Sequence, residues 1–103
     1  MIDVEISRAA EADLIDLWLH ISADDDAAAD RQLDHFDRVF RLLATQPLMG
    51  VDRSAMLQEG VRSFVVDQHR GFYRVDAKLR ILRVLHGTRD WMAVLGESNA
   101  GAA

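Results

Sequence analysis

The side chains best suited to chemistry in this sequence are arginines, and most of them lie in its second half. Guanidinium groups stay protonated and form paired hydrogen bonds with carboxylates or phosphates, so they favour anion binding over proton transfer. A solvated sheet face with scattered cations would give the same composition. From Pro47 onward the basic residues are Lys78 and the seven arginines Arg53, Arg62, Arg70, Arg74, Arg80, Arg83 and Arg89.

Histidine is the other candidate for acid–base work, because it titrates near neutral pH. His86 ends an apolar run, where it could act as an acid or base, but a structural bond to the turn at residues 87–90 is the favoured interpretation. His20, His35 and His69 show no ligand spacing supported by carboxylates, and the chain has no cysteine. We therefore predict no metal site, no cofactor and no thiol chemistry.

Charge is unevenly distributed along the chain. Up to Gln46 eleven acids stand against four arginines, a net charge of −7, whereas from Pro47 onward six acids stand against eight basic residues, a net charge of +2. Such asymmetry indicates an interaction surface. The total of −5 disfavours direct DNA binding by this chain alone.

Composition places the chain among ordinary globular proteins. Its 103 residues, 50% hydrophobic and 28% charged, suit one domain, which we expect at residues 1–96 with a flexible tail at residues 97–103. No apolar run approaches the ~20 residues of a membrane span. Acids stand at residues 3 and 5, where a signal peptide would carry positive charge. We expect a cytoplasmic protein without membrane contact.

The first half of the chain predicts one strand and two helices. Residues 2–7 alternate between apolar and polar side chains, which is typical of a half-buried strand. Ser7 suits the N-cap of a helix starting at residue 8, and Pro47 ends a second helix at residues 27–46. The stripes expected to be buried are Ala10, Leu14, Leu17, Trp18 and Ile21 on the first helix, and Leu33, Phe36, Phe40 and Leu43 on the second.

The second half predicts strands at residues 61–66, 69–75 and 79–86, joined by two-residue turns into an antiparallel meander. The tail from Thr88 could add one short helix, ended by Gly96. The expected fold class is α+β: an N-terminal strand, then a two-helix antiparallel hairpin packed on a mainly antiparallel sheet that contains the three-stranded meander. We expect the first strand to join that sheet.

Several short segments are more specific than the composition. In order they are residues 7–14 (SRAAEADL), 17–18 (LW), 42–44 (LLA), 47–50 (PLMG), 60–64 (GVRSF), 72–75 (FYRV) and 81–90 (ILRVLHGTRD). Any one of them would be weak, but all of them in this order, over roughly residues 2–92, resemble the ParE-type toxins of the ParE/RelE superfamily.

The resemblance implies a small α+β toxin, encoded beside a ParD-like antitoxin that silences it and forms a hetero-oligomer with it. ParE-type members are taken to inhibit DNA gyrase and so block replication. RelE-type relatives share the fold but cleave messenger RNA on the ribosome. Function therefore depends on the site residues rather than on the fold.

The RelE catalytic pattern is incomplete in this sequence. Arg70 and Arg89 can be aligned with its two arginines, but its lysine positions fall near Arg62 and Phe64, and residues 91–95 contain no tyrosine. Arginine is a poor general base. We therefore expect a gyrase-directed toxin that acts by binding and has no catalytic residue. The alternatives are a RelE-like ribosome-dependent mRNA endoribonuclease and a non-toxic interaction module.

Two sets of binding residues are predicted. Two of the candidate target-binding residues have a competing structural interpretation: Arg83 could form an ion pair across the sheet, and Trp91 could cover the sheet edge. Tyr73 is expected in the core. The helical hairpin and the adjoining strand edge, with an apolar groove and acidic rims, would receive the antitoxin. The target-binding set is Arg62, Arg70, Arg83, His86, Arg89 and Trp91, and the antitoxin-binding set is Leu14, Leu17, Leu48 and Met49.

Overall fold

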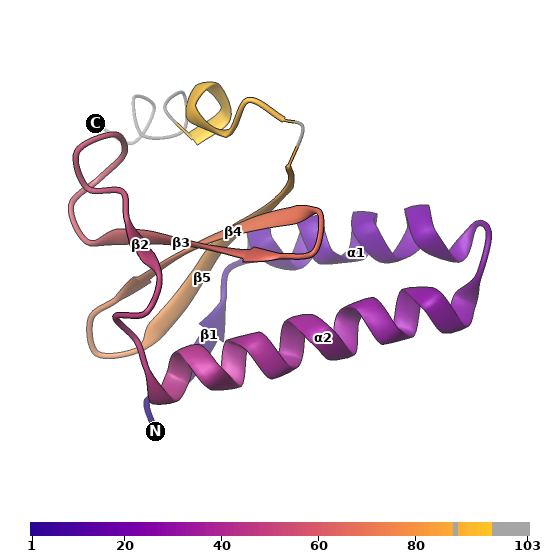
Figure 1. The fold of residues 1–103 in the computed structure, drawn as a ribbon, viewed down its shortest axis with the longest axis horizontal. Coiled ribbons are helices and arrows are strands. Elements are labelled where there is room, and N and C mark those ends of the chain that lie inside the picture. Colours follow the sequence, from indigo (N-terminus) through magenta and orange to yellow (C-terminus); the bar gives the residue numbers. More distant parts are fainter. Residues whose placement is uncertain (88, 96–103) are drawn as a thin grey trace.

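One strand and a helical hairpin precede four further strands in the computed structural model, which describes residues 1–87 and 89–95 (Figure 1). The predicted tail at residues 97–103, together with Thr88 and Gly96, lies outside the described residues. The elements are β1 (Val4–Ile6), α1 (Arg8–Ser22), α2 (Asp26–Thr45), β2 (Val51–Asp52), β3 (Val61–Val66), β4 (His69–Val75) and β5 (Leu79–His86).

Both helices begin at capping side chains. The Ser7 hydroxyl accepts a hydrogen bond from the Ala10 backbone N–H at 3.0 Å, and the Asp25 carboxylate accepts one from Ala28 at 3.1 Å. Pro47 follows the last turn of α2, where a proline cannot continue the helix. The predicted helices are confirmed, with α2 beginning and ending one residue earlier than expected.

The five strands form one sheet in the order β1-β5-β4-β3-β2. The predicted meander of β3, β4 and β5 is antiparallel, and β1 joins it by parallel pairing with β5. Three residues, not two, separate β4 from β5. β2 was not predicted, since two residues are too short to leave an alternation in the sequence.

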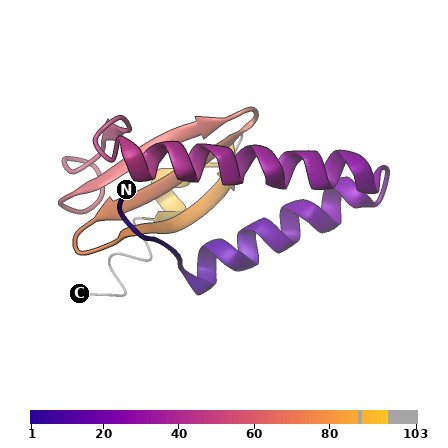
Figure 2. The same ribbon diagram turned by 90° about the horizontal axis from the view of Figure 1, so that it is seen from below.

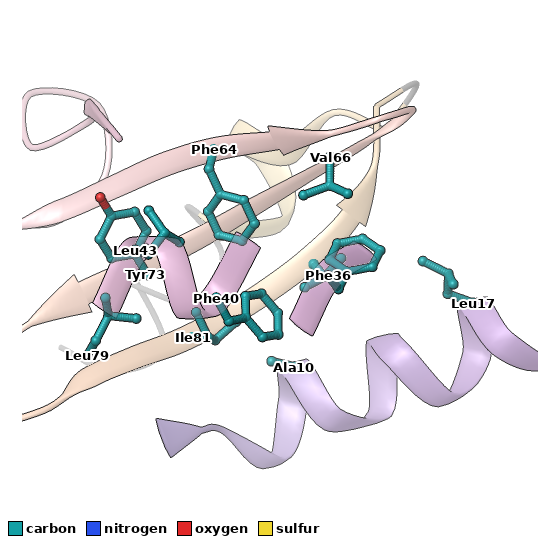
Figure 3. Packing of buried hydrophobic residues seen from close by; sticks show 11 residues of the cluster. Ala10, Leu17, Phe36, Phe40, Leu43, Phe64, Val66, Tyr73, Leu79 and Ile81 are labelled. Carbon is teal, nitrogen blue, oxygen red and sulfur yellow. The ribbon is translucent and has the colours of Figure 1, made fainter. Parts of the chain in front are cut away.

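The helical hairpin covers one face of the sheet (Figure 2). Phe36 and Phe40 of α2 pack against Phe64, Val66 and Tyr73 of the sheet (Figure 3). Neighbouring aromatic rings there have centroids 5.9–6.0 Å apart for the Phe36–Phe40, Phe40–Phe64 and Phe64–Tyr73 pairs. The predicted apolar stripes of both helices supply this core except for Trp18, which is only partly buried because its indole lies between the two helices and donates to the Asp30 carboxylate of α2 at 2.9 Å. The core also contains Ala10, Leu17, Leu43, Leu79, Ile81 and Val84.

β1 is more exposed than predicted. Val4 and Ile6 are 37% and 40% exposed, because β1 is an edge strand of three residues. Only Ile2, just before β1, packs against the core, and its backbone N–H donates to the Ala44 carbonyl at 3.1 Å. The expected half-buried strand is therefore wrong in its burial, though correct in its position.

The opposite face of the sheet carries a second, smaller core. Val61, Phe72 and Leu85 point to this face and contact a helical turn at residues 91–95, which lies across the sheet from α1 and α2 (Figure 1). The Trp91 and Phe72 ring centroids are 5.2 Å apart. Residues 91–95 thus form the short helix expected in the tail.

The loop after α2 is held by Tyr73. Its buried hydroxyl donates to the Pro47 carbonyl at 2.7 Å and accepts from the Gly50 N–H at 2.9 Å, so Tyr73 is the core residue that was predicted. Burial raises the pKa of Tyr73, which keeps the phenol protonated as a donor. A Cβ at Gly50 would lie 2.5 Å from that hydroxyl, so this close approach requires glycine.

Replacing Tyr73 with phenylalanine should lower the free energy of unfolding by about 1–3 kcal/mol, because the Pro47 carbonyl and the Gly50 N–H lose their shared partner while the ring stays in place. Urea unfolding followed by circular dichroism measures the change. An unchanged midpoint would show that the hydroxyl does not hold the loop.

Candidate functional site

Two arginines share one indole ring on the second face of the sheet. The guanidinium carbon of Arg53 lies 5.2 Å from the centroid of the Trp91 ring, and that of Arg70 lies 5.7 Å from it. Both distances are within the range of cation–π attraction. We call the surface formed by Arg53, Arg70 and Trp91 the arginine–tryptophan face.

Each member of this face is positioned by a neighbouring element. Arg70 lies in β4, paired with Val65 of β3 and Leu85 of β5, and Trp91 packs on Phe72. Arg53 follows β2, and its Nε donates to the hydroxyl of buried Ser63 at 2.9 Å. Arg70 and Trp91 belong to the predicted target-binding set and are brought together here.

Arg53 was missed by the sequence analysis. Its position depends on β2, whose two residues leave no periodic signal, so nothing in the pattern distinguished Arg53 from the other arginines. Within residues 1–87 and 89–95, neither Arg53 nor Arg70 has a carboxylate within ion-pair distance. Two positive charges at most about 11 Å apart therefore lack a compensating acid among the described residues, on a chain whose net charge is −5.

An apolar groove adjoins this face. A hollow of about 310 Å³ lies between the second half of α2, β2 and β3, and we call it the β3 groove. Arg70 is the one charged residue among those that line it, so the groove and the arginine–tryptophan face share that side chain. Its exposed apolar residues are Leu42 (44% exposed), Met49 (49%), Val51 (55%) and Val65 (61%).

The predicted antitoxin-binding residues do not form one groove. Leu17 is 8% exposed and belongs to the core, and Leu14 is half-buried against it. Leu48 is 70% exposed in the loop after α2, and Met49 lines the β3 groove. The helical stripe that suggested Leu14 and Leu17 is the stripe that buries α1 on the sheet, so these two side chains support the fold.

Arg62 holds the loop that carries Leu48 and Met49. Its Nη1 donates to the carbonyl of Gly50 at 2.8 Å and to that of Leu48 at 3.2 Å. Together with Tyr73, it fixes the backbone of this loop from the helix-covered side of the sheet. The structure thus places Arg62 apart from the arginine–tryptophan face.

Arg83 joins the helical hairpin to the sheet. Its Nε and Nη2 donate to the two carboxylate oxygens of Asp13 at 2.8 and 3.0 Å, and the Val84 N–H donates to the same carboxylate at 2.9 Å. The hydrogen bonds that Arg83 donates to Asp13 raise the pKa of Arg83, against the opposing effect of burial. An ion pair was the competing interpretation for Arg83, but its partner lies on α1 rather than across the sheet.

Three histidines lie close together where the end of α1 meets the start of β4 and the end of β5. Two adjoining hollows of about 310 and 330 Å³ are both lined by His20, His69 and His86, and Arg89 lines the first. The remaining histidine, His35, bonds through Nδ1 to the Asp67 carboxylate at 2.9 Å. His86 and Arg89 of the predicted target-binding set therefore lie together, but in a different place from Arg70 and Trp91.

The environment of His69 disfavours the protonated form of its imidazole. Its ring meets those of His86 and Phe36 edge-on, with centroids 5.4 and 5.7 Å away. Burial lowers the pKa of His69, and the positive charge of His86 lowers it further, while Asp67 opposes them. Its Nδ1 is buried without a hydrogen-bond partner among the described residues, and a backbone hydrogen bond with Val66 raises the pKa too little to offset burial.

Two kinds of site are not found in the described part of the chain. Residues 1–87 and 89–95 contain no group of three or more histidines and acids arranged to hold a metal ion. Among the helices formed by these residues, none has the length and apolar character needed to cross a bilayer.

Replacing Arg83 with glutamine should lower the free energy of unfolding by about 2–3 kcal/mol, because the largely buried Asp13 carboxylate loses its paired donors. Arg80→Gln in the same strand is the matched control. Its ion pairs with Glu5 and Asp76 are long and exposed, so it should change stability by less than about 1 kcal/mol. Equal losses in the two variants would contradict the structural role of Arg83.

Stability should fall as the pH drops below 6.5, the ordinary pKa of histidine, because the folded state binds a proton at His69 less readily than the unfolded chain does. The contribution is complete above that pH and is lost as the pH falls toward the lowered pKa. His69→Asn should weaken the dependence, whereas His20→Asn, at the exposed rim of the same hollows, should retain it. Urea unfolding at pH 7.5 and 5.5 compares them; equal dependence in His69→Asn and the parent chain would refute the role of His69.

Known proteins share this fold and this sequence pattern. Residues 4–91 match the family model described as the ParE toxin of the type II toxin–antitoxin system parDE. The chain is 33% identical over 93 residues to Toxin ParE1 of Caulobacter vibrioides, an alignment that covers 88% of this chain and 95% of the relative.

Two solved structures are similar in three dimensions. A chain from the chromosomal ParDE TA system of P. aeruginosa has a TM-score of 0.70 at 22% identity, covering 84% of this chain and 96% of that one. A chain of the RelBE2 toxin–antitoxin complex from Mycobacterium tuberculosis has a TM-score of 0.54 at 26% identity, covering 82% and 96%. With the family match, these findings confirm the expected fold and show that the chain belongs to the ParE family of type II toxin–antitoxin toxins.

Proposed function

We propose that this ParE-family toxin inhibits DNA gyrase in the cytoplasm, and so blocks replication, by binding through its arginine–tryptophan face. The observation that carries the proposal is the stacking of Arg53 and Arg70 on Trp91, with no carboxylate at ion-pair distance among the described residues. Tryptophan and arginine are the residue types that contribute most to protein–protein affinity. Their grouping on an otherwise acidic chain therefore favours recognition of a macromolecular target.

Binding, not bond cleavage, is the action that this face supports. The groups in contact there are two guanidiniums, an indole and the Ser63 hydroxyl. None of them is a general base at neutral pH, because guanidinium stays protonated and the indole N–H only donates. We therefore propose a toxin that is not itself an enzyme.

We further propose that a ParD-like antitoxin silences the toxin by covering the β3 groove and the adjacent loop. Leu48 and Met49 are exposed there on a backbone held by Tyr73 and Arg62, so the surface is formed before any partner arrives. Contiguous apolar side chains at the surface of a small domain are typical of a protein interface. The partner would form a hetero-oligomer with this chain.

A ribosome-dependent mRNA endoribonuclease is the second candidate. One observation favours it: His20, His69, His86 and Arg89 line the same hollow, which places three imidazoles near a guanidinium. Imidazoles can exchange protons with a ribose hydroxyl and a leaving oxygen, while a cation holds the phosphate. Asp16 lines the hollow too and would repel RNA, whereas the charge of Asp13 is compensated by Arg83, so we rank this candidate below gyrase inhibition.

Inducing the chain in bacterial cells should arrest growth, induce the DNA-damage response and leave transcripts intact. The Arg53→Gln/Arg70→Gln variant should lose toxicity and bind gyrase more than about tenfold more weakly, since each interface arginine can contribute about 2 kcal/mol. Arg41→Gln, which removes an exposed charge that pairs with Asp37 within α2, is the matched control and should remain toxic.

Other outcomes would overturn the proposal in distinct ways. Arrest with cleaved transcripts, abolished by His69→Asn or His86→Asn, would establish the ribonuclease instead. Full toxicity of a folded Arg53→Gln/Arg70→Gln variant would exclude the arginine–tryptophan face as the target contact. Absence of any growth effect, with the chain expressed and folded, would favour a non-toxic interaction module.

A further inference from the structure

In the part of the chain that the structure describes, the outer edge of β3 is unpaired along the second half of the strand, at residues 64–66. β2 pairs with it only through Val51–Ser63 and Asp52–Arg62, so within the described residues nothing pairs with the outer side of residues 64–66. Unpaired strand edges accept further strands unless a protein protects them with charge, proline or a covering segment. Here the neighbouring side chains are the exposed apolar residues of the β3 groove, which do not protect the edge.

Side chains of β3 alternate between the two faces of the sheet, and this determines which residues an added strand would contact on each face. Phe64 and Val66 point toward the helices, whereas Ser63 and Val65 point to the second face, where Val65 pairs with Arg70. Side chains of an added strand alternate in the same way. One set would enter the β3 groove beside Val39 and Leu42, and the other would lie on the second face near Arg70.

Charge determines which side chain suits the second face. The guanidinium carbons of Arg53 and Arg70 lie 5.2 and 5.7 Å from one ring centroid, and so at most about 11 Å apart; their charges repel each other, and an anion bound nearby is attracted by both. A carboxylate matches the guanidinium fork. A nucleic acid strand suits the surroundings less well, because the chain is acidic overall and its first 46 residues carry a net charge of −7.

We infer that the antitoxin adds an extended segment to the free edge of β3, with apolar side chains in the β3 groove and a Glu or Asp carboxylate bound by Arg53 and Arg70. The inference rests on the proposed neutralisation by an antitoxin and gives that partner its chemistry. Because Arg70 belongs to both surfaces, the bound segment masks the arginines that would contact the target. Neutralisation is then direct competition for two side chains.

A pair of peptides tests the inference with the full chain. The probe is acetyl-Leu-Glu-Leu-Glu-Leu-amide, and its control carries glutamine in place of both glutamates. Trp18→Phe leaves Trp91 as the sole tryptophan, so its fluorescence reports binding at the arginine pair, and backbone amide shifts at residues 64–66 report pairing with the edge. Trp18 donates only an exposed hydrogen bond to Asp30, so its replacement should leave the fold intact.

The glutamate peptide should shift both signals and bind roughly tenfold or more tightly than the glutamine peptide, because it forms charge-assisted hydrogen bonds with the arginines. Arg53→Gln/Arg70→Gln should abolish that difference while retaining the edge shifts. Equal binding of the two peptides, or no shift at residues 64–66, overturns the inference. So does a ten-nucleotide single-stranded DNA that shifts Trp91 when neither peptide does.

These outcomes are independent of the proposed function. A chain that poisons gyrase in cells yet ignores both peptides keeps its function and loses this mode of neutralisation. If the chain binds the glutamate peptide as expected but has no effect on gyrase, the inference about the bound segment holds and the proposed target is wrong.

Discussion

The domain depends on the layer of aromatic rings that joins α2 to the sheet. Phe36, Phe40, Phe64 and Tyr73 follow one another at centroid distances near 6 Å, within the core cluster that joins both helices to the sheet. Because strands alternate, each ring fixed on the helix side sends its neighbours to the other face. Phe72, next to Tyr73, and Arg70, two residues before Phe72, reach the second face for this reason. The core thus determines which side chains remain available to a partner.

The fold could be predicted from the sequence because its signals are local. Strict alternation, helical stripes and capping residues gave the positions of both helices and of β3, β4 and β5 almost to the residue. The site could be predicted only in part. Arg70 and Trp91 do lie together, but Arg83 bonds to Asp13, seventy positions away in the chain, and Arg62 bonds to backbone carbonyls. The residue type shows which groups an arginine can bind. Only the tertiary structure shows which group each guanidinium already contacts.

The two faces of the sheet differ in their chemistry. On the second face Arg53 and Arg70 present guanidinium groups, whose charge does not titrate in the physiological range. On the helix-covered side His20, His69 and His86 line two adjoining hollows, although His69 directly precedes Arg70 in β4. Strand alternation therefore separates a permanent cationic surface from a cluster of imidazoles within two consecutive residues.

The open edge of β3 has a consequence for the chain on its own. Residues 64–66 present backbone donors and acceptors to any strand, including the same strand of another copy. Such an edge is a site for self-association, so we expect the solubility of the chain to depend on whether the edge is covered. A partner that covered this edge would protect the chain from aggregation, which is a role distinct from any effect on its activity.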